Sequence, residues 1–123
     1  MRRKQRIILI QEGKGMTVKD LAERLNLETL TATEPEREIK GAYVGDLLSW
    51  VMGRAQSGDA WITIMTNINT VAVASLADVA CVVLAEDCEI EPSVVGTAEA
   101  KGINLLRSSK TAFELCAALS ELI

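Results

Sequence analysis

The chain has 123 residues, 49% of them hydrophobic, so it has room for one folded domain that buries roughly two thirds of its unfolded surface. It contains no histidine, which excludes imidazole catalysis, a Ser-His triad and the common zinc sites. The formal net charge is −4, and an acidic domain repels phosphate backbones, so we do not expect nucleic acid as a partner.

The first 15 residues form a basic segment. Five Lys or Arg against Glu12 give residues 1–15 a net charge of +4, which leaves −8 on residues 16–123. We expect a poorly ordered N-terminal extension, with an electrostatic arm as the alternative. The apolar run at residues 7–10 is far shorter than a membrane span or a secretory h-region. The odd number of cysteines, three, indicates reduced thiols. We therefore expect a cytoplasmic protein with no membrane partner.

A short helix is predicted after Thr17. Thr17 is a good N-cap, Asp20 follows three residues later, and apolar residues recur at helical spacing. Residues 16–27 also resemble the first helix of a helix-turn-helix. The next segment, residues 30–36, contains β-prone residues, a proline and carboxylates instead of a recognition helix, so we do not expect DNA binding.

The next predicted elements are a strand end or connection at residues 39–43, a helix opened by Gly45 and Asp46, and a buried strand at residues 60–65. The apolar residues of the helix fall within about 140° of arc at helical spacing. They are Leu47, Leu48, Val51, Met52 and Ala55.

Residues 71–79 carry two overlapping patterns. Residues 71–74 alternate like a strand, whereas Val73, Leu76 and Val79 share one helical face. Asn69 as N-cap and the alanine content favour a short buried helix. The apolar run at residues 80–85 then predicts a strand covered on both faces.

Two further units complete the pattern. Glu91 and Pro92 start a helix that ends near residues 101–102, residues 103–106 form a strand, and Thr111 with Glu114 forms a capping box at the last helix. The alternation predicts an α/β fold: a single three-layer α/β/α domain with a mostly parallel sheet.

Five segments together resemble a stand-alone DRTGG domain, over residues 16–123. They are residues 41–49, 61–63, 67–74, Pro92 and 102–106. The DRTGG family is similar to the middle domain of long phosphotransacetylases and to the N-terminal domain of HPr kinase/phosphorylase, and often occurs beside CBS domains. The resemblance implies a three-layer α/β/α fold and a regulatory or ligand-binding role without catalysis.

Two departures from the family pattern bear on phosphate binding. The Asp-Arg and Thr-Gly-Gly of the eponymous motif correspond to residues 67–69 and 85–87, which lack the basic residue and the glycines. Residues 13–15 do not have the spacing of a P-loop, so we do not expect kinase activity.

Small polar side chains follow the predicted strands, and ligands of parallel sheets bind outside the carboxyl ends of the strands. The sequence thus predicts a crevice for a small polar or anionic ligand, with helix N-termini at its rim. The alternative is that Asp46, Asn69 and Thr111 are only helix caps. The predicted ligand-binding residues are Asp46, Asn67, Asn69, Glu86, Arg107, Ser108, Ser109 and Thr111.

The acidic segment at residues 86–91 holds four carboxylates and Cys88. A divalent cation site and a solvated loop are the alternatives, and the absence of EF-hand spacing favours the loop, so no metal or cofactor is expected. The neighbouring carboxylates are expected to raise the pKa of the Cys88 thiol.

Trp50 lies at the edge of its helix's apolar stripe, which suggests partial exposure and a homodimer interface. The leading hypothesis is a non-catalytic regulatory module that senses a nucleotide or phosphorylated metabolite and relays this to a partner enzyme or regulator. The alternative is a ligand-free homodimeric or adaptor interaction module. An enzyme using the carboxylates of Asp46 or Glu86 ranks third.

Overall fold

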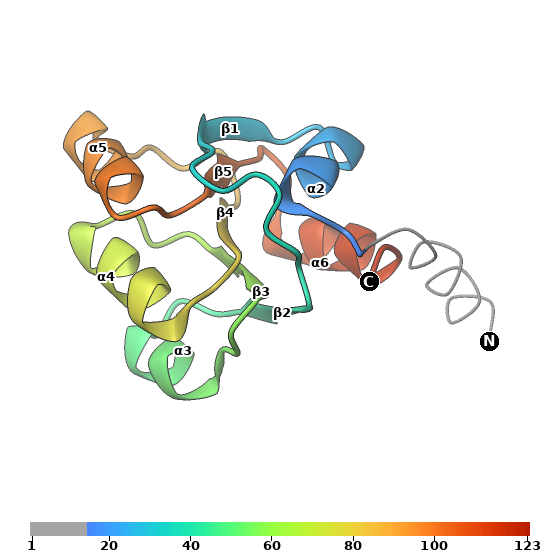
Figure 1. Cartoon of the computed structure of the whole chain (residues 1–123), viewed down its shortest axis with the longest axis horizontal. Coiled ribbons are helices and arrows are strands. Elements are labelled where there is room, and N and C mark those ends of the chain that lie inside the picture. The colour runs from blue at the N-terminus through green and yellow to red at the C-terminus, as the bar shows by residue number, and fades with distance from the viewer. Residues whose placement is uncertain (1–14) are drawn as a thin grey trace.

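The structure is a computed structural model that describes residues 15–123, and the predicted extension at residues 1–15 lies outside that range except for Gly15. Within it, five helices and five strands follow one another along the chain (Figure 1). They are α2 (Val18–Arg24), β1 (Glu28–Thr31), β2 (Gly41–Val44), α3 (Leu48–Arg54), β3 (Asp59–Thr63), α4 (Ile68–Ala77), β4 (Cys81–Leu84), α5 (Pro92–Ala100), β5 (Leu105–Arg107) and α6 (Ala112–Ser120). No helix in residues 15–123 is long and apolar enough to cross a membrane.

The five strands form one sheet in the order β1-β5-β4-β3-β2. Strands β2, β3, β4 and β5 are parallel to one another, and β1 runs antiparallel to β5 with an irregular register between Thr29 and Thr31. The prediction of an α/β domain with a mostly parallel sheet is confirmed. The first strand, β1, was not predicted.

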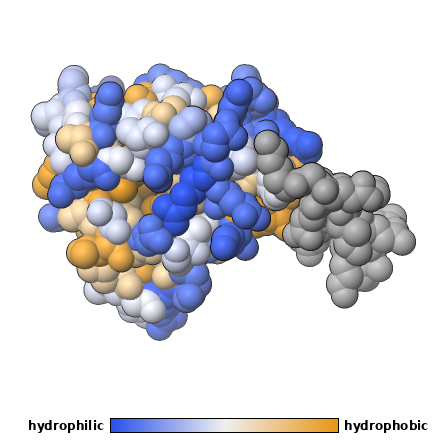
Figure 2. All heavy atoms as spheres, in the orientation of Figure 1, coloured by the Kyte–Doolittle hydropathy of each residue, from blue (hydrophilic) through white to orange (hydrophobic). Residues whose placement is uncertain are grey.

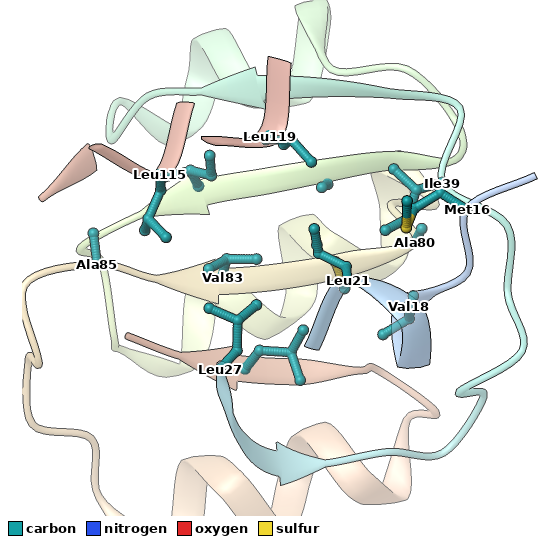
Figure 3. Packing of buried hydrophobic residues seen from close by; sticks show 14 residues of the cluster. Met16, Val18, Leu21, Leu27, Ile39, Ala80, Val83, Ala85, Leu115 and Leu119 are labelled. Carbon is teal, nitrogen blue, oxygen red and sulfur yellow. The ribbon is translucent and has the colours of Figure 1, made fainter. Parts of the chain in front are cut away.

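Helices cover both faces of the sheet, which confirms the three layers. On one face, α2 and α6 bury Val18, Leu21, Leu115 and Leu119 against the strands (Figure 3). On the other face, α3, α4 and α5 pack on the sheet through Val51, Val71, Ala74, Val94 and Ala98. β4 lies between these layers: Cys81 and Val83 face α2 and α6, while Val82 and Leu84 face the other three helices. This is the reason for its continuous apolar run.

The caps of α2 and α6 follow the prediction. Asp20 N–H donates to Thr17 Oγ1 at 3.0 Å, and Glu114 N–H donates to Thr111 Oγ1 at 3.1 Å. Each acidic side chain accepts the N–H of its cap residue in return, so both are capping boxes. Each box fixes the start of its helix with local contacts alone.

Two predicted helix starts are corrected. The N-cap of α4 is Asn67, not Asn69, because Asn67 Oδ1 accepts the N–H of Asn69 at 2.8 Å. Asp46 does not cap α3, whose N-cap is Leu47. The carboxylate of Asp46 accepts hydrogen bonds from the end of β3 instead, which leaves the start of α3 without a side-chain cap.

The predicted apolar stripe of α3 is buried only in part. Val51 is fully buried, whereas Leu47 is 60% exposed and Met52 44% exposed. Because α3 starts at residue 48 and has only two turns, it touches the core mainly through Val51. Trp50 is 52% exposed, in line with the predicted partial exposure, and Arg54 lies over its ring at 3.8 Å from the centroid.

The surface carries apolar side chains over α4 as well. In Figure 2 hydrophilic residues cross the middle of the face shown, and apolar residues gather where α4 lies. Ile68 at the start of α4 is 48% exposed and Leu76 is 71% exposed. The helices of this layer thus leave apolar surface outside the core.

Candidate functional site

An open groove of about 990 Å³ lies at the carboxyl ends of β3 and β4. Its walls are the segment between β3 and α4 and the segment that leads into α5, so the N-termini of two helices border it. It is lined by Ile64, Met65, Thr66, Asn67, Ile68, Glu89, Ile90, Glu91, Pro92, Ser93, Val94 and Thr97. This is the position at which parallel sheets bind ligands.

Hydrogen bonds fix the wall between β3 and α4. Asn67 caps α4 through Asn69, and the buried Thr70 hydroxyl donates to Met65 O at 3.0 Å. The N–H of Met65 in turn donates to Thr63 Oγ1 at 3.1 Å. These bonds hold the first turn of α4 and the segment before it in a fixed conformation.

The groove carries two carboxylates and no Lys or Arg in its lining. Glu91 is the N-cap residue of α5 but makes no side-chain cap bond, and Pro92 follows at the first helical positions. Helix N-termini attract acceptor groups, whereas carboxylates attract donors or cations. The groove therefore suits a ligand that presents both kinds of group, such as hydroxyls and ring nitrogens, beside an apolar surface.

A second pocket, of about 360 Å³, lies at the same end of the sheet near β1 and β5. It is lined by Leu25, Asn26, Glu28, Asp87, Arg107, Ser108, Ser109 and Lys110. Arg107 is already engaged there: Nε and Nη2 donate to the two oxygens of Glu28 at 2.9 and 3.1 Å, and Nη1 donates to Cys88 O at 3.2 Å. The pair lowers the pKa of Glu28 and raises the pKa of Arg107, chiefly through these hydrogen bonds.

A left-handed turn separates the two pockets. Glu86 and Asp87 have φ of 64° and 52°, and their N–H groups donate to Lys110 O and Ser108 O at 2.8 and 2.7 Å. This binds the chain after β4 to the segment after β5. Arg107, Ser108 and Ser109 at the end of β5 line the second pocket, whereas the residues that follow β3 line the large groove.

Asp46 joins β2 to β3 at their carboxyl ends. Its Oδ1 accepts from Thr63 Oγ1 at 2.7 Å and from Ile64 N–H at 2.9 Å. The buried Trp61 reinforces the joint, because its Nε1 donates to Gly45 O at 2.9 Å. Asp46 thus satisfies backbone and hydroxyl donors of the fold with one of its two oxygens.

The structure distributes the predicted ligand-binding residues over more than one place. Asn67 lines the large groove, whereas Asn69, in the first turn of α4, lines neither the groove nor the second pocket. Arg107, Ser108 and Ser109 line the second pocket. Asp46, Glu86 and Thr111 line neither of these two pockets. The predicted residues therefore do not line one common crevice. A binding role for them stays a prediction.

Five polar residues of the groove are not among the predicted ligand-binding residues: Thr66, Glu89, Glu91, Ser93 and Thr97. The start of a helix at Glu91 and Pro92 was predicted, and this was the available signal. It makes α5 the next element after β4, so the segment that leads into α5 follows the carboxyl end of that strand.

The cysteines are poor nucleophiles. Burial raises the pKa of Cys81 to about 12. The pKa of Cys88 is also raised, as predicted, but burial is the first cause, with Asp87 and Asp46 adding to it and Arg107 opposing it. Burial raises the pKa of Cys116 as well. Thiolate chemistry is therefore unfavourable at all three positions.

Among residues 15–123, no group of three or more His, Cys, Asp or Glu side chains is arranged to hold a metal ion. The carboxylates of residues 86–91 point to different neighbours: Asp87 lies 3.8 Å from Arg107 Nε, and Glu89 and Glu91 line the groove. The segment is a turn and a groove wall.

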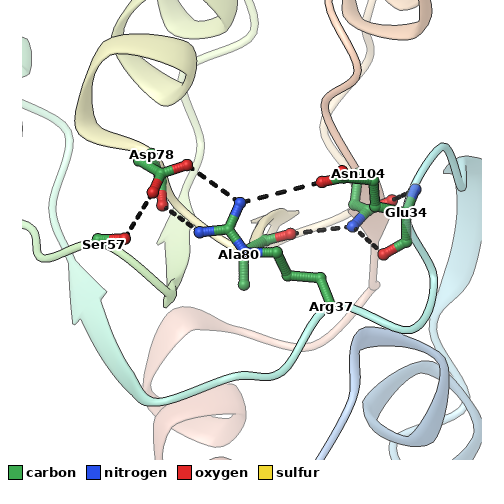
Figure 4. A network of polar contacts seen from close by, with 6 residues as sticks. All are labelled: Glu34, Arg37, Ser57, Asp78, Ala80 and Asn104. Carbon is green, nitrogen blue, oxygen red and sulfur yellow. Dashed lines mark hydrogen bonds and ion pairs between the residues drawn. The ribbon is translucent and has the colours of Figure 1, made fainter.

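A polar network occupies the opposite, amino end of the parallel strands (Figure 4). Arg37 donates to Asp78 Oδ1 and to Asp78 O at 3.1 and 2.8 Å, and Ser57 Oγ donates to Asp78 Oδ2 at 2.5 Å. Asn104, only 2% exposed, accepts the N–H of Glu34 and donates to Glu34 O and Ala80 O. Its three side-chain bonds join three segments of the chain.

Comparison with known proteins supports the architecture. No family model matches the chain, and no curated protein matches it either. Among solved structures, it is similar to the CBS and DRTGG domains of the regulatory region of Clostridium perfringens pyrophosphatase, a structure complexed with the activator diadenosine tetraphosphate. The TM-score is 0.65 at 12% sequence identity.

The match covers 87% of this chain but only 47% of that regulatory region, so the chain spans about half of it. At this identity the likeness shows the fold. The fold and the groove together define the class of protein: a three-layer α/β domain with an open groove at the carboxyl ends of its parallel strands. Its solved counterpart belongs to the regulatory part of an enzyme.

Proposed function

We propose that this chain is a non-catalytic regulatory module of the DRTGG type that binds a small ligand in the carboxyl-end groove and relays its presence to a partner enzyme or regulator. The observation that carries the proposal is the groove of about 990 Å³ between the N-termini of α4 and α5. Pockets of about 300 to 1,000 Å³ are the usual size for small ligands.

The similar fold supports a nucleotide-like ligand. The regulatory region of the pyrophosphatase was solved with a dinucleotide activator, although the matching part is about half of that region. In this chain the groove offers apolar side chains for a base and helix N–H groups for acceptors. Glu89 and Glu91 suit ribose hydroxyls or amino groups better than phosphates, because like charges repel. A nucleoside or nucleotide whose phosphates remain in solvent fits these features.

A thermal-shift screen against nucleosides, nucleotides and phosphorylated metabolites tests the proposal. A ligand at 100 times its dissociation constant adds about 2.7 kcal/mol to the free energy of unfolding, which is a readily measured rise in Tm. A complete screen without any stabilisation contradicts ligand sensing.

A blocking variant locates the site. Ser93→Tyr places a large side chain in the groove, and the exposed Ser93 is free to change without loss of core packing. Glu99→Tyr puts the same side chain on α5 outside the groove lining and is the matched control. We expect the ligand-induced rise in Tm to vanish in the first variant and to persist in the second. Equal rises in both place the ligand elsewhere, the pocket of Arg107 being the next to test.

The relay to a partner needs a separate experiment. The expected result is that a purified stoichiometric partner binds with a different affinity in the presence of the ligand, because a ligand shifts binding only through differential affinity. A partner whose affinity is the same with and without ligand supports the adaptor alternative instead. The exposed apolar side chains over α3 and α4 favour that alternative as the second candidate.

A further inference from the structure

The two edges of the sheet differ in their protection. β1 is irregular between Thr29 and Thr31, and its Glu28 carries a charge in the pair with Arg107. Irregular register and charge are two devices by which edge strands avoid pairing with other chains. β2, Gly-Ala-Tyr-Val, has neither, and it keeps a regular register with β3 over all four residues.

The outer side of β2 offers backbone hydrogen-bonding groups. The N–H of Gly45 donates to Ile62 O at 3.1 Å, and backbone groups alternate in direction along a strand. The N–H and C=O groups of Ala42 and Val44 therefore point away from β3. Both residues are exposed, and among the described strands β2 pairs with β3 alone.

Apolar side chains flank this edge on both faces of the sheet. On the face of α6, a pocket of about 350 Å³ is lined by Ala42, Tyr43, Val44, Ile62, Cys116, Leu119, Ser120 and Ile123. On the other face lie Leu47 and Trp50, each more than half exposed. An uncharged edge between two exposed apolar surfaces is typical of strand addition by a partner.

We propose that β2 pairs antiparallel with β2 of a second copy of this chain about a twofold axis, which joins two five-stranded sheets into one. The outward-facing groups select the register: Ala42 of one copy lies opposite Val44 of the other, so Tyr43 lies opposite its symmetry mate. The exposed Lys40 and Asp46 lie just beyond the two ends of β2. Antiparallel pairing therefore brings the Lys40 end of one copy to the Asp46 end of the other.

Because β2 is complementary to itself, we take the strand that pairs with its free edge to be β2 of a second copy of this chain. The strand matches itself in hydrogen bonding, in apolar surface and in the charges at its ends. Pairing of β2 with β1 of another copy would propagate into a filament, and the irregular, charged edge of β1 opposes it. The assembly is therefore closed at two chains.

The oligomeric state tests the proposal. Size-exclusion chromatography with light scattering, at high micromolar concentration, is expected to give twice the 13.3 kDa of one chain. Val44→Lys places a charge on the paired edge and is expected to weaken association at least tenfold. Thr29→Lys, also at an exposed edge position, is the control and leaves the dimer intact. A folded wild type that remains monomeric, or a Val44→Lys protein that dimerises as wild type does, overturns the proposal.

Cross-linking tests the register. Opposed residues of a non-hydrogen-bonded antiparallel pair have Cα atoms about 4.5 Å apart, within reach of a disulfide. Tyr43→Cys is therefore expected to form an intermolecular disulfide on mild oxidation, beyond the level seen in wild type with its three native thiols. Thr29→Cys is expected to stay at the wild-type level. A dimer in which Tyr43→Cys does not cross-link overturns this pairing.

Discussion

The polar network at the amino end of the parallel strands and the groove at their carboxyl end differ in how far their side chains are hydrogen-bonded. At the amino end, Asn104 satisfies three backbone groups, and Asp78 accepts from both Arg37 and Ser57. At the carboxyl end, Glu89 and Ser93 line an open groove and make no side-chain hydrogen bond or ion pair within residues 15–123. A saturated network stabilises the fold, because its loss leaves buried groups unpaired. Side chains of the open groove that have no partner in the fold are available to a ligand.

The largest effect is expected at Asn104. Asn104→Leu removes the amide while keeping a similar volume, so Glu34 N–H, Glu34 O and Ala80 O lose their partner. Each buried unpaired group costs about 1 to 3 kcal/mol, and Glu34 is exposed enough for water to compensate in part. We expect a loss of about 3 kcal/mol in the free energy of unfolding, measured by urea denaturation. The exposed Asn69→Ala is the control, with a change within about 0.5 kcal/mol. A loss below 1 kcal/mol for Asn104→Leu would remove the distinction between the two ends.

An intermediate effect is expected at Asn67, which both caps α4 and lines the groove. Asn67→Ala removes the acceptor of the Asn69 N–H and is expected to cost about 1 kcal/mol. Asn67→Asp keeps an acceptor at a helix N-terminus and should restore stability to within a few tenths of a kcal/mol. If both variants are equally destabilised, the cap is not the cause.

A smaller, pH-dependent effect is expected at Asp78. The hydrogen bond from Ser57, and then Arg37, holds the pKa of Asp78 below its usual value. A lowered folded-state pKa contributes stability above the unfolded value of about 3.9 and loses it as pH falls through the folded value. Asp78→Asn keeps a residue that tolerates the left-handed φ of 58°.

Because Asp78 is largely exposed and screened, the difference at pH 7 is expected to stay under about 1 kcal/mol. The wild type and the variant should converge in urea unfolding when the pH is lowered from 7 to below the folded-state pKa, where the carboxyl is protonated in both states. A difference that is the same at both pH values would attribute the effect to packing instead of charge.

The smallest effect is expected in the groove itself. Glu89→Gln removes a charge that has no hydrogen-bonding partner among the described residues. The free energy of unfolding should change by less than about 0.5 kcal/mol at pH 7. A loss above 1 kcal/mol would show that the groove side chains stabilise the fold, and would weaken the case for a ligand site.

Local sequence signals predicted the elements that local contacts create. The capping residues Thr17 and Thr111 act within four residues of the chain, and both boxes form. The continuous apolar run of β4 and the helix start at Pro92 were equally readable. Helix at residues 71–79 was the correct choice over strand, since α4 covers most of that range.

The missed strand shows where local signals end. β1 is a four-residue edge strand that begins with two exposed residues, and its pairing with β5 joins Glu28 to Arg107. The sequence of β1 does not alternate between buried and exposed residues. It becomes a strand only because it pairs with β5, which is distant in the sequence. The same separation made Arg107 look available for a ligand, because Glu28 is remote in sequence.

The sequence by itself determined the α/β alternation, the capped helices and a polar end of the sheet, because helix caps and apolar runs depend on neighbours a few residues away. Tertiary structure decided which of these polar side chains are engaged. It committed Arg107 to Glu28, Asp46 to β3 and Asn104 to Glu34 and Ala80. It also opened the groove between α4 and α5. Hydrogen-bonding partners up to 79 residues apart meet only when the sheet assembles, so the pairing that separates a structural residue from an available one follows from strand order.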